Sequence, residues 1–163
     1  MRLNLVKKTI GAALAIMLFG SMPLSAAQDK PADNMQILRD KIRADKKLVV
    51  ATNMELTESE TKGFWPIYEQ YQKDLQKINQ RVANLLESYA DDFRGKSLTD
   101  DKAKKLINEA VSIDEAEANL KSTYAPKLSK VLPVRKVARY LQIENKIRAV
   151  VKYDIASGVP LVR

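Results

Sequence analysis

The fold is decided by residues 64–89, which read FWPIYEQYQKDLQKINQRVANLLESY. In this stretch, apolar and aromatic residues recur at alternating steps of four and three, a spacing that places them along one side of a helix as a heptad seam. A helix from Pro66 to Phe93 would be about 42 Å long, so we expect an elongated molecule. The seam positions are Phe64, Tyr68, Tyr71, Leu75, Ile78, Val82, Leu85 and Tyr89.

The residues just before this stretch predict where its helix begins. Leu56 is followed by Thr57, whose hydroxyl can accept the amide proton of Glu60 while the Glu60 carboxylate accepts that of Thr57. This reciprocal arrangement is a capping box. Pro66 has no N–H, and its ring disfavours helical geometry at Trp65. We therefore expect the helix to kink or restart at Pro66.

Two further helices are predicted downstream. The turn Arg94–Ser97 is followed by Leu98 and by Thr99, which can cap a third helix. A fourth helix is predicted from Val134 to Ala156, with an extended apolar tail at Pro160–Val162. The stripe of the third helix is Ala103, Leu106, Ala110, Ile113, Glu117, Leu120 and Tyr124.

Glu117 occupies a seam position of the third helix where an apolar residue is expected. Three interpretations are open: Glu117 pairs with a basic group across the seam, sets the register, or lies at a widened, wet part of the hairpin.

A first helix is predicted ahead of the long one. Asp33 and Asn34 can cap it, and it should end near Asn53. Its apolar stripe is Met35, Leu38, Ile42 and Val49. The predicted fold is therefore all-α, an elongated antiparallel helical hairpin of four helices. The seam offers more apolar surface than three shorter helices of one chain should cover. We therefore expect a homodimer with coiled-coil packing.

Residues 1–27 have the pattern of a secretory signal peptide. Basic residues at the start precede an apolar run from Ile10 to Phe19, and Ser25-Ala26-Ala27 fits a cleavage site. The run is short for a membrane span, which needs about 20 residues. We expect cleavage after Ala27 and a single soluble helical domain, 28–163, exported to the periplasm.

Composition excludes several kinds of chemistry. The 163 residues include no Cys and no His. This removes disulfides, thiol nucleophiles, histidine-based triads and ordinary zinc sites. Carboxylate pairs remain at Asp91-Asp92, Asp100-Asp101 and Glu115/Glu117, which leaves a small carboxylate-dependent hydrolase as a minor alternative. We expect no enzyme, no metal and no cofactor.

Basic residues gather toward the C-terminus. Residues 127–163 carry nine basic and two acidic side chains, whereas residues 28–126 carry 16 basic and 18 acidic ones. The basic face of the fourth helix is therefore a candidate surface for clients, and a merely solvated helix face is the alternative. Trp65 joins this set because it lies off the seam line. The candidate client-binding residues are Trp65, Arg135, Lys136, Arg139, Tyr140, Lys146 and Arg148.

Two short motifs resemble those of a known family. Residues 56–60 read Leu-Thr-Glu-Ser-Glu and residues 98–102 read Leu-Thr-Asp-Asp-Lys. They are similar to the paired Leu-Thr-x-x-Gln motifs of the Spy/CpxP-type periplasmic stress proteins, with Glu60 and Lys102 in place of Gln. Phe64-Trp65-Pro66, the stretch Gln142–Lys146 and the ending Pro160–Val162 more closely resemble uncharacterised exported bacterial helical proteins.

The resemblance implies a curved antiparallel dimer with a basic concave face that holds unfolded clients or docks on a sensor domain. Metal-binding relatives use His, which this chain lacks. We therefore expect a periplasmic, ATP-independent chaperone-like or stress-adaptor protein. The alternative is a regulatory subunit docking on a membrane sensor. The expected partners are unfolded or acidic clients or a periplasmic sensor domain, with weak contact to an anionic membrane surface and no nucleic acid.

Overall fold

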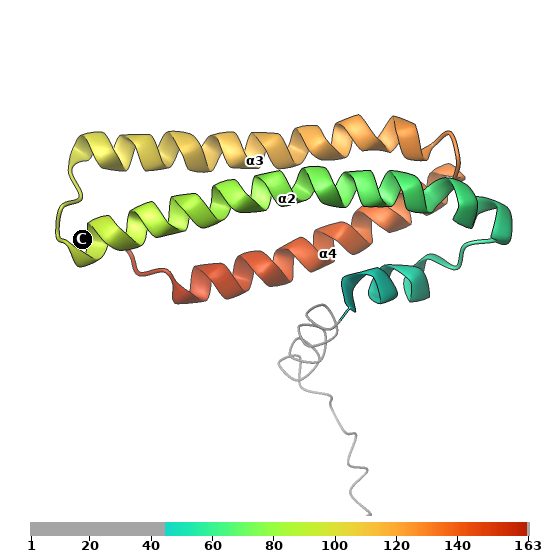
Figure 1. Cartoon of the computed structure of the whole chain (residues 1–163), viewed down its shortest axis with the longest axis horizontal. Coiled ribbons are helices and arrows are strands. Elements are labelled where there is room, and N and C mark those ends of the chain that lie inside the picture. The colour runs from blue at the N-terminus through green and yellow to red at the C-terminus, as the bar shows by residue number, and fades with distance from the viewer. Residues whose placement is uncertain (1–44, 163) are drawn as a thin grey trace, which may run out of the picture.

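The protein is built from helices joined by short turns, as the computed structural model shows for residues 45–162, the part of the chain described below (Figure 1). Residues 45–54 are helical and precede α2 (Glu58–Arg94), α3 (Asp100–Leu128) and α4 (Val134–Gly158). No strand occurs among the described residues. The all-α prediction is therefore confirmed, and the long helices give the molecule an elongated shape.

The three long helices lie roughly alongside one another, with α2 between α3 and α4 (Figure 1). The segment 45–54 lies beside the first part of α4. We call the end formed by the α2–α3 turn, residues 95–99, the loop end, and the end formed by residues 55–68 the aromatic end. The C-terminus lies at the loop end.

The start of α2 has the predicted cap. The amide of Glu60 donates to Thr57 Oγ1 at 3.3 Å, and the amide of Thr57 donates to Glu60 Oε2 at 2.8 Å. Thr99 caps α3 by accepting the amide proton of Lys102 at 3.4 Å. Both predicted helix starts, with Leu56 and Leu98 just before the capping threonines, are thereby confirmed.

The predicted restart at Pro66 is wrong. Helix α2 runs without a break through 37 residues, with Pro66 inside it. A proline removes one backbone hydrogen bond. Here Phe64 and Tyr68, on either side of Pro66, are both buried in the core, and this packing stabilises the helix through the proline.

The other helix ends differ only slightly from expectation. Arg94 belongs to α2 rather than to the turn, and α4 extends two residues past Ala156. The predicted signal segment 1–27, the caps Asp33 and Asn34 and the stripe residues Met35, Leu38 and Ile42 lie outside the described residues. The described part of the first helix ends at Met54, next to the predicted Asn53.

The core follows the predicted seam, but unevenly. The seam residues from Phe64 to Ile78 are buried, whereas Val82, Leu85 and Tyr89 are half-buried. Tyr140 packs against Phe64 and Tyr71, with ring centroids 5.2 Å and 5.7 Å apart. The chain's own helices therefore cover the seam at the aromatic end and leave it partly open toward the loop end. The dimer stays a prediction.

Gly63 marks the closest approach between α2 and the α3–α4 turn. A Cβ atom at this position would lie 2.8 Å from Val131 Cβ, well inside van der Waals contact. Any larger residue would push the turn away from α2.

Among the described residues, no helix is both long and apolar enough to cross a membrane.

Candidate functional site

Two of the predicted basic contact residues bind the turn that precedes α2. Lys136 Nζ lies 2.6 Å from Glu60 Oε2 and donates to the Glu55 carbonyl at 2.8 Å. Arg139 Nη1 lies 3.2 Å from the Glu55 carboxylate. The hydrogen bond from Lys136, followed by that from the Thr57 amide, lowers the pKa of Glu60. These two bases join α4 to the start of α2.

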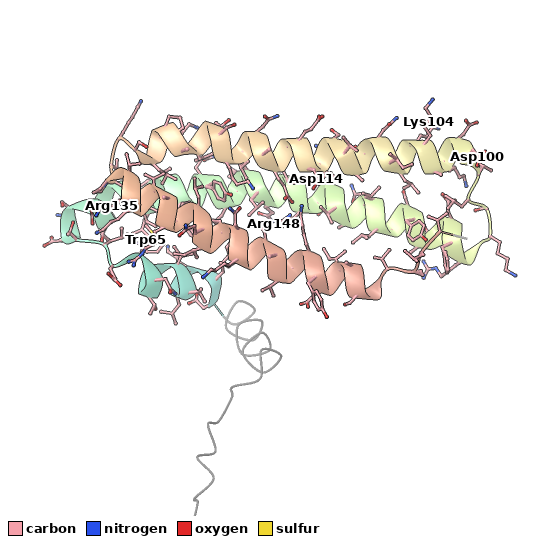
Figure 2. All side chains as sticks on the ribbon, turned by 180° about the vertical axis from the view of Figure 1, so that it is seen from behind. Trp65, Asp100, Lys104, Asp114, Arg135 and Arg148 are labelled. Atoms are coloured by element: carbon pink, nitrogen blue, oxygen red, sulfur yellow. The ribbon has the colours of Figure 1, made fainter. Side chains whose placement is uncertain are left out.

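Arg148 joins α4 to both other long helices. Its Nη1 donates to Asn79 Oδ1 on α2 at 2.7 Å, and its Nη2 bonds the Glu117 carboxylate on α3. Lys152 approaches Asp114 at 2.8 Å and Glu117 at 3.0 Å. Figure 2 shows Arg148 and Asp114 in the middle of the molecule. The interpretation that Glu117 pairs with a basic group across the seam is confirmed.

Only Arg135 and Lys146 of the predicted basic set are exposed without an ion pair to any residue in 45–162. They are eleven positions apart on α4, about 16 Å along its axis. Arg135 lies at the aromatic end (Figure 2). Three of the five predicted basic residues are therefore held in ion pairs with other parts of the chain, and client binding by this set stays a prediction.

Of the two predicted aromatic contact residues, one is inaccessible. Tyr140 has no exposed surface and packs edge-to-face against Phe64, so its assignment to a client surface is wrong. Burial, with the nearby Glu144 charge adding to it, raises the pKa of Tyr140 far above its usual range. Trp65 is half-buried, with its ring centroid 5.0 Å from Lys47 Nζ and from the Phe64 ring. The part of the Trp65 ring that contacts Phe64 therefore belongs to the core.

A polar cluster lies inside the aromatic core. The carboxylate of Glu144 has no exposed surface and accepts from Lys46 Nζ and Gln72 Nε2, each at 2.8 Å. Lys46 also donates to Gln72 Oε1 at 2.7 Å, and Gln72 Nε2 lies 3.4 Å from the Tyr140 hydroxyl. Every polar group has a partner, so the cluster links the segment 45–54 to α2 and α4 rather than offering a free reactive group.

An accessible apolar groove lies at the loop end. A groove of about 540 Å³ runs between α2, α3 and the C-terminal tail. Tyr89 Oη donates to the Pro160 carbonyl at 2.8 Å, which fixes the tail as one wall. The groove contains no charged side chain, and its lining residues are Leu85, Leu86, Tyr89, Leu98, Ala103, Leu106, Ile107, Ala110, Val159, Pro160, Leu161 and Val162. We call this the loop-end groove.

Unusually exposed apolar residues line or flank the loop-end groove. Ile107 is 61% exposed, Val111 is 53% exposed and Leu161 is 88% exposed. Contiguous exposed apolar surface of this kind marks interaction sites. The sequence analysis did not assign this site, although the apolar tail and the two apolar residues beside the α3 stripe were available as signals.

The catalytic options are narrow in the described part of the chain. Residues 45–162 contain no group of three or more His, Cys, Asp or Glu side chains placed to hold a metal ion. Asp92 is engaged by Lys102 at 2.5 Å, and Asp114 is engaged by Lys152. These two carboxylates are therefore held in ion pairs.

Comparison of the chain with family models, with curated proteins and with solved structures gives no match.

Proposed function

We propose that the protein is an exported, ATP-independent chaperone-like or stress-adaptor protein that holds apolar segments of client proteins. The observation that carries this proposal is the loop-end groove, an accessible apolar surface of about 540 Å³ without charged side chains. Volumes of a few hundred Å³ are typical of sites that bury a small ligand or a few side chains.

The lining of the groove favours tolerance over selectivity. A site gains sequence specificity from polar groups that must be matched by the ligand. Here the Tyr89 hydroxyl already bonds the tail, and the other lining side chains are apolar. We therefore expect the groove to accept varied apolar side chains from an extended or unfolded chain.

Charge has a steering role in this proposal. Residues 28–163 carry 25 basic and 20 acidic side chains, a net charge of +5. A net charge of this sign attracts acidic polypeptides and speeds their encounter with the protein. Because Lys136, Arg139 and Arg148 are held in ion pairs, we assign the holding of the client to the groove.

An aggregation assay with the chain 28–163 tests the proposal. Ile107→Glu combined with Leu161→Glu places two charges at the groove, and both positions are largely exposed, so folding should be little affected. We expect the double variant to need several-fold more protein than the parent to suppress aggregation of an unfolding acidic client.

The matched control is Val134→Glu, which charges a valine that is 75% exposed at the opposite end of the molecule. It should protect the client as well as the parent does. If the groove variant retains full protection at unchanged helicity, the groove does not hold clients. A single partner crosslinked in cells, with no protection of unrelated clients, would instead favour the regulatory alternative.

A further inference from the structure

The tail, residues 159–162, lies between two cavities at the loop end. The loop-end groove is on its α3 side, and a second cavity of about 470 Å³ is on its α4 side. We call the second one the α4-side cavity. Leu86 and Tyr89 on α2 and Val159 and Pro160 in the tail line both cavities. The tail therefore divides a surface of α2 that the two cavities share.

The α4-side cavity offers apolar surface as well. Phe93 on α2 and Ile155 on α4 belong to its lining, together with the charged residues Arg94 and Asp154. The Phe93 ring also packs against the Tyr89 ring, with centroids 5.8 Å apart. Tyr89 therefore joins the apolar linings of the two cavities.

The tail itself crosses from one cavity to the other. Of the two cavities, Gly158 lines the α4-side cavity, whereas Leu161 and Val162 line the loop-end groove. Val159 has extended backbone, with φ −96° and ψ 117°. Figure 1 shows the chain running from the end of α4 to the end of α2. The tail is thus an extended apolar segment that lies across α2.

Few contacts hold the tail in this place. The 2.8 Å bond from Tyr89 Oη to the Pro160 carbonyl is the one hydrogen bond from the tail to α2 or α3 within residues 45–162. Leu161 is 88% exposed and Val162 is 64% exposed. A segment with so few buried contacts opens locally at a low cost in free energy. The tail can therefore leave α2 while the helices stay folded.

We propose that the tail is a displaceable strap, and that an extended apolar segment of a client takes its path across α2. This inference rests on the proposed function and adds how access to the site is regulated. A helix with its side chains is about 10 Å wide, and an extended chain advances about 3.3 Å per residue. A segment that reaches both cavities therefore carries apolar side chains about three residues apart, as Val159 and Val162 are.

The strap lowers the affinity for such a client. When a site is competent only with the strap released, its dissociation constant rises by the factor that favours the closed state. One neutral hydrogen bond, such as that from Tyr89, corresponds to a factor of about two to ten. Shorter apolar groups enter the loop-end groove without this cost, because they do not cross the tail.

Electron paramagnetic resonance of a nitroxide label follows the tail directly. The chain 28–163 has no native cysteine, so Leu161→Cys takes the label at one exposed position. Reduced, carboxymethylated α-lactalbumin, an unfolded acidic protein, serves as the client. We expect saturating client to raise the mobile fraction of the label at least twofold, because the client replaces the tail. Tyr89→Phe should raise the mobile fraction without client, since it removes the hydrogen bond to Pro160.

The matched control carries the label at Val134→Cys, an exposed position at the opposite end of the molecule. Its spectrum should not change with client or with Tyr89→Phe. A client that binds without mobilising the Leu161→Cys label, or that immobilises the label, would overturn the inference. The proposed function would survive that result, because the tail would then be a fixed or closing wall of the site.

The dissociation constant of the same client, measured by fluorescence anisotropy, gives an independent test. A chain that ends at Gly158 keeps the whole of α4 and loses the tail. With helicity unchanged by circular dichroism, it should bind the client about two- to tenfold more tightly than the chain 28–163 does. Equal or weaker binding would contradict the strap. If neither chain binds the client, the proposed function fails, and the inference fails with it.

Discussion

The ion pair between Lys46 and Glu144 allows a quantitative test of how the first described segment is held. The Glu144 carboxylate has no exposed surface, whereas the Lys46 side chain is 23% exposed. Lys46→Met removes the cation from the buried Glu144 carboxylate and leaves the hydrogen bond from the Gln72 amide in place. Breaking a buried pair in this way costs roughly 3–5 kcal/mol, and the partial exposure of Lys46 places the expected loss near about 3 kcal/mol.

The reverse change should be milder. In Glu144→Leu, the Lys46 ammonium can turn toward solvent along its flexible stem, so we expect a loss of about 1 kcal/mol. The double variant Lys46→Met/Glu144→Leu removes both charges and should also lose about 1 kcal/mol, because apolar replacement of a buried pair is often close to neutral. The coupling energy is then about 3 kcal/mol.

Urea denaturation followed by far-UV circular dichroism measures these free energies of unfolding. The control cycle uses Lys47→Gln and Glu69→Gln, a pair with the same 2.8 Å separation but with side chains 53% and 63% exposed. Its coupling should stay below about 1 kcal/mol. Additive losses in the Lys46 and Glu144 cycle would refute the reasoning, because they would mean that burial does not strengthen the pair.

Two other predictions address packing and pH. Gly63→Ala should destabilise the protein by about 1 kcal/mol, because the cost of the clash between the added methyl and the α3–α4 turn exceeds the gain in helix propensity. Gly158→Ala, which has open space around it, should leave the free energy of unfolding unchanged in the same urea titration. An equally stable Gly63→Ala variant would show that the turn moves aside without cost. The pKa of Asp74 is lowered to about 2 by hydrogen bonds from Lys77 and then Tyr124, so its stabilising contribution is present above the unfolded pKa near 3.8 and is lost as the pH falls toward about 2. Asp74→Asn should therefore be less stable than the parent at neutral pH, and the difference should shrink through this acidic range; a difference that does not depend on pH would contradict the assignment.

Local sequence signals predicted most of the fold. The capping threonines Thr57 and Thr99 act through residues only three positions away, so their chemistry can be recognised in the sequence. The seam was equally clear because helical periodicity depends on spacing alone. The expected restart at Pro66 failed because distant packing of Phe64 and Tyr68 outweighs the loss of one hydrogen bond.

The candidate site was harder to predict, because it depends on which surfaces of different helices meet. The charge of Arg148 is visible in the sequence, but its pairing with Glu117 depends on the placement of α4 against α3. Tyr140 resembles a surface aromatic beside Arg139, yet it points into the core. The loop-end groove combines residues from α2, α3 and the tail, and no local pattern brings these together.

The uneven burial along α2 has a consequence for how the molecule opens. Interlocking rings and the fully bonded Glu144 cluster make the aromatic end an anchor. The other end has half-buried seam residues and a tail tied by the Tyr89 hydrogen bond. Local unfolding starts where buried apolar contacts are fewest. We therefore expect the loop end to open at a lower cost in free energy than the anchored half, and the loop-end groove to widen when it does.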